Sequence, residues 1–253
     1  MSENPSAHGS IPVMSSPHPQ FAHHVLGVIL SVRDGALSVL LWQRGRAPQR
    51  GAWALPGGIV EATETLETSI RRHLAAKVDI DQVAHLEQLE TRSEPARHPG
   101  ERVIATGFLG VVRSDASPEL PSDTRWHPIA RAGHGGALPA VDDLPKCAFD
   151  HRALITAGQA RLRAKLSYTN VAFALAPETF TISELRALYV AALGYDVDAT
   201  NLQRVLVRRE VIAPTAVLSR PGRSGGRPAA RFRFRSAGLV VTDPFAVLRP
   251  PGP

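Results

Sequence analysis

The chain has 253 residues, a length that fits one large domain or a mid-sized domain joined to a small one. Its composition, 43% hydrophobic and 21% charged, is that of a globular protein and excludes a disordered chain. The formal net charge is +6, and no apolar run approaches the roughly eighteen residues of a membrane span, so we expect no membrane partner.

The N-terminal segment, residues 1–20, has no basic region followed by an apolar core, so we expect a flexible tail rather than a signal peptide. The chain contains one cysteine, Cys147, which excludes an internal disulfide and suits a cytoplasmic location. No base is arranged locally around Cys147. We therefore interpret it as a small buried hydrophobic residue rather than as a nucleophile.

The first predicted elements are two strands and a helix. Residues 24–31 and 37–42 are apolar segments joined by Arg33-Asp34-Gly35, a sequence typical of a hairpin turn. A loop rich in glycine and proline follows. Residues 61–77 then carry apolar side chains at the spacing of one buried helix face, namely Leu66, Ile70 and Leu74.

Three further segments complete the first unit. Residues 102–112 are rich in β-branched side chains and predict a central strand. Glycine and proline interrupt residues 118–145, which we interpret mostly as loops. Residues 149–166 predict a helix that joins this unit to the rest of the chain.

The second unit begins near Ser167 with a helix predicted over residues 182–193. Its start carries a capping box, because the Thr181 hydroxyl and the Glu184 carboxylate can bond each other's backbone amides. Gly194 follows, and glycine takes the left-handed conformation that ends a helix without a steric penalty.

A second helix and two short strands complete this unit. Asp198 can cap a helix over residues 199–209, and residues 213–218 and 230–234 predict strands on either side of a glycine-rich loop. Helix, turn, helix and basic hairpin, in that order, indicate a winged helix-turn-helix. The alternative is a small α/β domain with a basic surface.

Positive charge is concentrated in this second unit. Between Ala199 and Thr242 the sequence contains a single carboxylate, Glu210. The same stretch holds the arginines Arg204, Arg208, Arg209, Arg220, Arg223, Arg227, Arg231, Arg233 and Arg235. Such a surface favours a polyanionic partner, and the alternative is an arginine-rich solvated segment.

Residues 51–80 resemble the Nudix signature, a loop–helix–loop that directs carboxylates onto a divalent metal. The metal in such a site neutralises a diphosphate and activates water. Matching positions are occupied by Gly58, Glu64, Arg72, Leu74 and Ile80.

The segment departs from the signature where the chemistry is carried. A glutamate, a glutamate pair and a glycine of the signature are replaced by His73, Ala76, Lys77 and Asp79. Hard divalent cations require oxygen ligands, and Glu64 and Glu67 alone are too few for diphosphate hydrolysis. We therefore predict a protein that is not an enzyme, with no catalytic residues and no metal site.

Most of the chain, from about residue 24 to residue 234, is similar to the NrtR family of Nudix-related transcriptional regulators. Two segments, WQRGRAPQRGAWALPGG and RHPGERVIATGFLG, resemble the segments that flank the signature in ADP-ribose-type Nudix domains. The linker and winged-helix elements of the NrtR regulators are resembled by CAFDHRALITAGQARLRAKLSYTNVAFALAPETFTISELRALY, ATNLQRVLVRR and GRPAARFRF. It implies an α+β fold in which a Nudix-type α/β/α sandwich precedes a C-terminal winged helix-turn-helix domain. The implied divisions are a flexible tail (1–20), a Nudix-like effector-sensing domain (21–150), a linker helix (151–166), a DNA-binding winged helix (167–240) and a C-terminal tail (241–253).

The resemblance implies a repressor of genes for NAD biosynthesis or salvage that binds a palindromic double-stranded DNA operator as a homodimer. Its effector would be ADP-ribose or a related NAD-derived nucleotide, and no cofactor would be required. One alternative is an active Nudix hydrolase of ADP-ribose-like substrates with an accessory nucleic-acid-binding domain. Another is an RNA-binding adaptor, for which Phe232 and Phe234 are the available stacking residues.

Candidate site residues follow from the resemblance, position by position. The candidates for the effector are Arg44, Arg46, Trp53, Gly57, Gly58, Glu64, Arg102 and Phe108. The arginines suit phosphates, the glycines permit a close backbone approach, and Trp53 is an apolar wall or an ordinary core aromatic. The candidates for DNA are Thr200, Asn201, Gln203, Arg204, Arg208 and Arg227, with polar side chains for base edges or phosphates.

Overall fold

The computed structural model describes residues 21–131, 141–218 and 229–243. The expected N-terminal tail, most of the expected C-terminal tail and Arg227 in the loop of the wing lie outside the described residues. Within the described ranges, no helix has both the length and the apolar character to cross a membrane.

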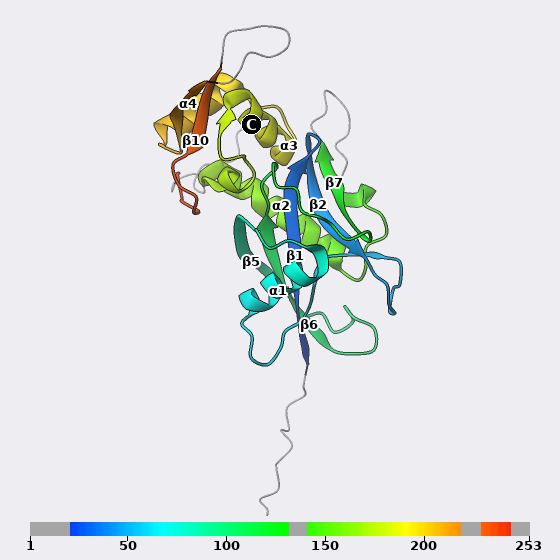
Figure 1. The fold of residues 1–253 in the computed structure, drawn as a ribbon. Coiled ribbons are helices and arrows are strands. Elements are labelled where there is room, and N and C mark those ends of the chain that lie inside the picture. Colours follow the sequence, from blue (N-terminus) through cyan, green and yellow to red (C-terminus); the bar gives the residue numbers. More distant parts are fainter. Residues whose placement is uncertain (1–20, 132–140, 219–228, 244–253) are drawn as a thin grey trace, which may run out of the picture.

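In the first part of the chain the described residues form a mixed sheet of seven strands with one helix on each side (Figure 1). Its strands are β1 (Ala22–Arg33), β2 (Ala36–Gln43), β3 (Trp53–Ala54), β4 (Gly57–Ile59), β5 (His85–Arg92), β6 (Val103–Val111) and β7 (Thr124–Arg131). The helices are α1 (Leu66–Val78), α2 (His151–Tyr168) and the short 3-10 helix η1 (Val141–Asp143).

The long strand β1 organises this sheet. It pairs antiparallel with β2 and β4 and parallel with β6. Successive side chains of a strand point to opposite faces. Val25 and Ile29 therefore pack with Ile70 and Leu74 of α1. The alternate residues of β1, among them Val28, pack in a second cluster with the apolar side chains of α2. This arrangement confirms the predicted α/β/α sandwich.

The hairpin between β1 and β2 is confirmed. Asp34 and Gly35 have φ values of 49° and 73°, the paired positive angles of a tight two-residue hairpin turn. The signature helix α1 begins at Leu66, later than predicted, because Thr65 is its N-cap and accepts a hydrogen bond from the Thr68 amide at 3.1 Å.

Part of residues 118–145 is a strand, so the interpretation of this segment mostly as loops was wrong there. Strand β7 pairs antiparallel with the edge of β2. Its Pro128 coincides with a shift of register, where a residue without an amide donor is tolerated. Ile129 beside it is fully buried. The proline indicated a loop in the sequence, and pairing along an edge accommodates it.

The second part of the chain is a winged helix. Its elements are the 3-10 helix η2 (Val171–Ala174), β8 (Phe180–Thr181), α3 (Ile182–Leu193), α4 (Ala199–Arg208), β9 (Ile212–Leu218) and β10 (Ala230–Phe234). The capping box of Thr181 and Glu184 is present, and Gly194 ends α3 with a φ of 83°. The Asp198 side chain caps α4. The described strands of this unit pair in the order β8–β10–β9.

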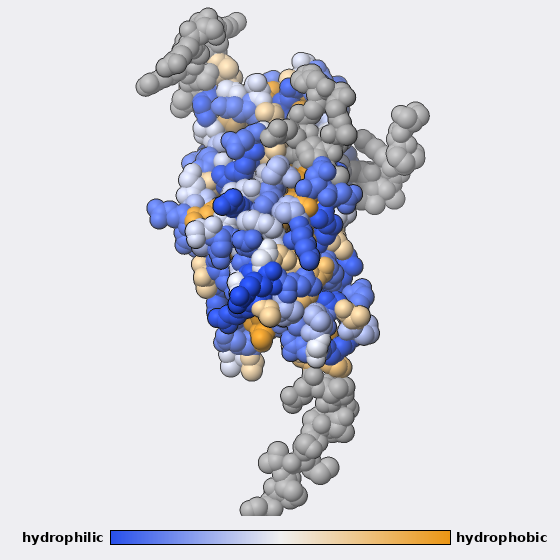
Figure 2. Space-filling model, turned by 90° about the vertical axis from the view of Figure 1, so that its right-hand side faces the viewer, coloured by the Kyte–Doolittle hydropathy of each residue, from blue (hydrophilic) through white to orange (hydrophobic). Residues whose placement is uncertain are grey.

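Helix α2 connects the two units physically as well as in sequence. One cluster of buried side chains runs from the sheet through Leu154 and Leu162 of α2 to Leu188 of α3 and Phe232 of β10. Arg163 of α2 also donates a hydrogen bond to the carbonyl of Ala192 at 3.3 Å. In Figure 1 the winged helix accordingly lies against one end of the sheet. On the face drawn in Figure 2, hydrophobic residues form small separate patches among hydrophilic ones.

Candidate functional site

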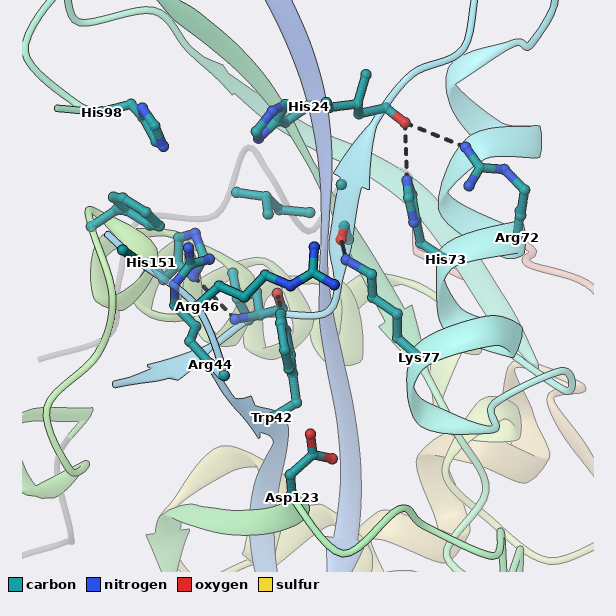
Figure 3. A pocket seen from close by; sticks show the side chains of 18 of the residues that line it. His24, Trp42, Arg44, Arg46, Arg72, His73, Lys77, His98, Asp123 and His151 are labelled. Carbon is teal, nitrogen blue, oxygen red and sulfur yellow. Dashed lines mark hydrogen bonds between the residues drawn. The ribbon is translucent and has the colours of Figure 1, made fainter. Parts of the chain in front are cut away.

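A cavity of about 930 Å³ lies beside β1 and β4, at the place where α1, the loop after β2 and the start of α2 meet. Many of the side chains that line it carry nitrogen atoms (Figure 3). The charged and aromatic residues of the lining are His24, Trp42, Arg44, Arg46, Glu61, Arg72, His73, Lys77, Arg97, His98, Asp123, Phe149 and His151.

Cations outnumber carboxylates in this cavity, and some of them are unneutralised. Arg72 is bound by Glu64, and Arg97 forms a bidentate pair with Asp150 at 2.7 and 3.0 Å. No ion pair within the described part of the chain involves the remaining cations of the lining, which are Arg44, Arg46 and Lys77. The cavity is therefore suited to an anionic ligand.

The wall formed by β4 depends on two adjacent glycines. Gly57 has a φ of 152°, and a Cβ there would lie 2.0 Å from the Val25 carbonyl oxygen. A Cβ on Gly58 would lie 2.5 Å from the His73 ring. The approach at Gly57 lets β4 lie close to the β1 backbone, and the approach at Gly58 lets the His73 ring of α1 lie against β4.

Two side chains of α1 bond carbonyls of β4 at positions where the Nudix signature has glutamates. The His73 Nε2 lies 3.0 Å from the Ile59 carbonyl oxygen, and the Lys77 ammonium donates to the Gly57 carbonyl at 2.6 Å. His73 is buried, and burial lowers the pKa of its imidazole. Burial, together with nearby Arg44 and Arg72, lowers the pKa of Lys77 as well.

The glutamates of the signature segment are engaged by arginines. Glu64 accepts from Arg72 at 2.5 and 2.7 Å, and this hydrogen bonding lowers the pKa of Glu64 to about 2. Glu67 accepts from Arg71 on the exposed side of α1. Among the described residues no group of three or more His, Cys, Asp or Glu side chains could hold a metal ion. The divalent metal that the Nudix fold implies therefore does not fit the residues present.

Rings gather at the other end of the cavity. His98 stacks on Phe149 with ring centroids 4.9 Å apart, and the Arg44 guanidinium lies 4.9 Å above the Phe149 ring. The Nε2 of His24 and the Nδ1 of His98 are buried and have no hydrogen-bond partner within the described part of the chain. Burial, with His98 and Arg97 nearby, lowers the pKa of His24 to about 4, so its ring is neutral at physiological pH. A buried unpaired nitrogen is costly, and a polar ligand atom would satisfy it.

His151, the first residue of α2, ties the cavity wall to the helix. Its Nδ1 accepts a hydrogen bond from the Leu55 amide at 3.0 Å. Complete burial lowers the pKa of this imidazole to about 3. Asp150, just before it, holds Arg97 of the opposite loop. The start of α2 is thus part of the cavity itself.

The structure places half of the predicted effector residues around this cavity. Arg44, Arg46, Gly57 and Gly58 line it. Four other predicted residues do not line it, namely Trp53, Glu64, Arg102 and Phe108.

Each of these four has another environment. Trp53 packs edge-on against His127 at 4.4 Å, and Phe108 is buried beneath α1. Arg102 donates to the Ser93 carbonyl at 2.5 Å, and Glu64 is held by Arg72. The half-buried Cys147 also packs against the core, and burial raises the pKa of its thiol.

Sequence reasoning missed the ring-lined end of the cavity. His24, His98, Phe149 and His151 come from β1, from the loop before β6 and from the start of α2. No spacing in the sequence joins them, because only the topology of the sheet brings these segments together. Trp42, near the end of β2, was also not predicted to line the cavity.

A second candidate surface lies on α4. Leu202 and Leu206 are buried, whereas the predicted DNA residues of this helix are all exposed, namely Thr200, Asn201, Gln203, Arg204 and Arg208. Arg204 donates to the Asn201 side chain at 2.7 Å. The exposed Arg233 and Arg235 of the β10 region were not predicted as binding residues.

Other residues of the basic unit have structural partners. Arg209 binds Asp243 at 2.5 Å, and Arg231 donates to the Thr179 carbonyl at 2.6 Å. Phe232 is buried, and Phe234 packs against Phe180 with centroids 5.2 Å apart. These rings do not form the exposed stacking platform that single-stranded RNA requires.

The two units match two family models in the same order. The NUDIX domain model matches residues 22–146, and the NrtR DNA-binding winged helix domain model matches residues 172–234. An ADPR-responsive transcriptional repressor NtrR from Acinetobacter baylyi is 30% identical over 209 residues, which cover 81% of this chain and 79% of that protein. The chain belongs to the NrtR family.

Solved structures agree with this membership. An NrtR from Shewanella oneidensis superposes with a TM-score of 0.71 at 27% identity, covering 84% of this chain and 94% of that one. The same NrtR in complex with a 27mer DNA gives a TM-score of 0.70 at 28% identity, covering 84% and 93%. An ADP-ribose pyrophosphatase from Methanocaldococcus jannaschii is 33% identical over 130 residues, 46% of this chain and 63% of that enzyme. The likeness to the NrtR proteins therefore extends over much more of the chain.

Proposed function

We propose that this protein is a transcriptional repressor that binds operator DNA through α4 and is controlled by ADP-ribose bound in the Nudix-like cavity. The observation that carries this proposal is the joining of an unneutralised cationic cavity to a winged helix by one helix that contributes to both. The similar repressor from Acinetobacter baylyi is ADPR-responsive, and the similar Shewanella NrtR binds DNA. The regulated genes would be those of NAD biosynthesis or salvage.

The cavity offers distinct groups for the two parts of such a ligand. The diphosphate would lie near Arg44, Arg46 and Lys77. No described carboxylate neutralises these three cations, so they can form charge-assisted hydrogen bonds with the phosphates. The base or a ribose would lie near His24 and His98, each of which has a buried ring nitrogen without a hydrogen-bond partner among the described residues. No further cofactor is needed for this recognition.

We propose in addition that the protein does not hydrolyse ADP-ribose. Hydrolysis in a Nudix site requires oxygen ligands for a divalent metal. Here Glu64 and Glu67 are held by arginines, and Lys77 bonds the Gly57 carbonyl. Incubation with Mg²⁺ or Mn²⁺ should give no release of AMP at an enzyme-like rate. Turnover of about 1 per second or more would favour the hydrolase alternative.

On the DNA side, α4 would enter the major groove with its exposed polar face. A single small winged helix contacts few base pairs, so we propose a homodimer that reads a palindromic operator with half-sites about one helical turn apart. Arg233 and Arg235 are exposed near the same unit and would contact phosphates.

Helix α2 is placed to couple the two sites. It begins at the cavity with His151, which holds the Leu55 amide, and its later turns pack against α3 and bond Ala192 through Arg163. A ligand that shifts the start of α2 would thereby reorient the winged helix. A useful switch needs a coupling of roughly 1–3 kcal/mol between ligand and DNA.

Calorimetry tests the proposal by comparing the affinity for ADP-ribose of the free protein and of the DNA-bound protein. An operator selected from random duplexes would be bound to the full chain, and ADP-ribose would be titrated into protein with and without saturating DNA. By linkage, a ligand that weakens DNA binding must bind less tightly to the DNA-bound protein by the same factor. Equal ligand affinity in the two states would overturn the sensor function and leave the Nudix half as a scaffold.

A further inference from the structure

We propose that the Lys77 ammonium takes the place of the divalent metal in this Nudix-like cavity, so that a diphosphate ligand binds without any metal ion. The inference rests on the proposed function, because ADP-ribose is the diphosphate considered. It differs from mere loss of the metal, since it assigns the missing positive charge to a particular side chain.

The position of Lys77 supports the assignment. It occupies one of the glutamate positions of the signature on α1, and its Nζ donates to the Gly57 carbonyl at 2.6 Å. The ammonium also lies 5.2 Å from the centre of the Trp42 ring, within the range of a cation–π contact. Two such contacts hold the charge at the cavity wall rather than in bulk water. Figure 3 shows Lys77 reaching the β4 backbone from the helix while Arg46 extends into the same cavity.

A metal ion would compete with this arrangement. A cation near β4 would need the carbonyl or carboxylate oxygens there, and the Gly57 oxygen already accepts from Lys77. The Ile59 oxygen is bonded by His73, and both oxygens of Glu64 accept from Arg72. Ala76 contributes no ligand. The carbonyl oxygens of Gly57 and Ile59 and the carboxylate of Glu64 are thus engaged by nitrogen atoms of this chain.

The electrostatics of the cavity favour an anion. Arg44, Arg72 and Arg46 all lie near enough to Lys77 to lower its pKa, in addition to the effect of burial. Like charges held together in this way repel one another, and a diphosphate placed among them relieves the repulsion. Such a ligand would make charge-assisted hydrogen bonds to several nitrogens at once.

The first experiment is a calorimetric titration of the full chain with the α,β-methylene analogue of ADP-ribose, which cannot be hydrolysed. One titration contains EDTA and the other contains saturating Mg²⁺. We expect the same Kd in both. Affinity at least tenfold tighter in Mg²⁺ than in EDTA would overturn the role of Lys77, whereas absence of binding in both conditions would contradict the proposed function itself.

The second experiment changes the charge directly. Lys77→Met should weaken binding in EDTA by about 10- to 100-fold, the loss of one charge-assisted contact, whereas Lys146→Met, at an exposed lysine outside the cavity, should not. Thermal unfolding of each variant verifies that it is folded. If the Lys77 variant is folded and binds as tightly as the unaltered protein, the proposal fails. If it does not fold, the comparison of EDTA with Mg²⁺ on the unaltered protein still decides.

Discussion

The imidazole of His151 is kept neutral by its position at the start of α2. It is buried, accepts a hydrogen bond from Leu55, and has a pKa of about 3. In the unfolded chain its pKa returns to about 6.5. Between these values the unfolded chain binds more protons than the folded one, so the free energy of unfolding falls as the pH drops below about 6.5.

We therefore predict that His151 makes the protein about 2 kcal/mol less stable at pH 5 than at pH 7. Urea denaturation at the two pH values measures this difference. His151→Asn retains an acceptor for the Leu55 amide but does not titrate, so the variant should lose that part of the pH dependence. The same pH dependence in both proteins would show that the His151 ring is not held neutral.

The unpaired nitrogen of His24 leads to a second prediction at this scale. His24→Phe keeps a ring but removes the nitrogen that would form a hydrogen bond with the ligand. The variant should bind ADP-ribose about tenfold more weakly. His127→Phe is a matched control, because the His127 Nε2 is also buried and unpaired but lies outside the cavity lining. Equal losses in the two variants would mean that His24 acts through general packing and not through the ligand.

At the scale of elements, the proposed DNA-binding role of α4 rests on a clear division of its faces. Leu202 and Leu206 fix the helix against the winged-helix core, and the arginines on the other face have no carboxylate partner among the described residues. The helix therefore presents its basic face without rearrangement, and its contacts with DNA can be tested one side chain at a time.

We predict that Arg204→Ala and Arg208→Ala each weaken operator binding while leaving the folded state and ADP-ribose binding unchanged. A base contact should cost about 1–3 kcal/mol and relax sequence preference, and a phosphate contact should reduce the salt slope by about 1. Fluorescence anisotropy over a series of salt concentrations distinguishes the two. Arg71→Ala, at an exposed arginine of α1, is the control. Unchanged affinity in both α4 variants would place the DNA surface elsewhere.

The sequence predicted the helical elements better than the strands. Helices α3 and α4 carry their boundaries in local signals, the Thr181–Glu184 box, Gly194 and the Asp198 cap. Strand β7 contains a proline and pairs with the edge of β2. Strand β5 consists mostly of polar residues, and Leu89 is its one buried residue. Such strands depend on partners distant in the chain, which local patterns do not reveal.

At the scale of the whole molecule, the candidate sites differ in the same way. The proposed DNA surface lies on one helix, so the periodicity of the sequence is enough to identify its outward residues. The cavity is assembled from β1, β4, α1, α2 and loops between them, and its histidines come together only through the sheet topology. The resemblance to Nudix proteins selected Gly57 and Gly58, which line the cavity, but it did not select His24 or Phe149.

The two units share one apolar cluster that passes through α2, so we predict a single cooperative unfolding transition for the full chain. ADP-ribose, which would bind only the folded protein, should raise the Tm of that transition as a whole. Scanning calorimetry with and without the ligand measures this. Two separate transitions, of which only one moves with ligand, would indicate that the winged helix folds independently and would weaken the case for coupling through α2.

The contacts of α1 side chains with the β4 carbonyls also restrict which substitutions this chain could accept during evolution. Restoring glutamates at His73, Ala76 and Lys77 would return the three glutamates of the signature, but it would remove the His73 contact from the Ile59 carbonyl and the Lys77 donor from the Gly57 carbonyl, and it would place carboxylates against both. Reversion at His73 or at Lys77 alone is therefore disfavoured. For the non-hydrolytic regulator proposed above, a return to hydrolysis would require several changes at once, so the loss of catalysis would be difficult to reverse.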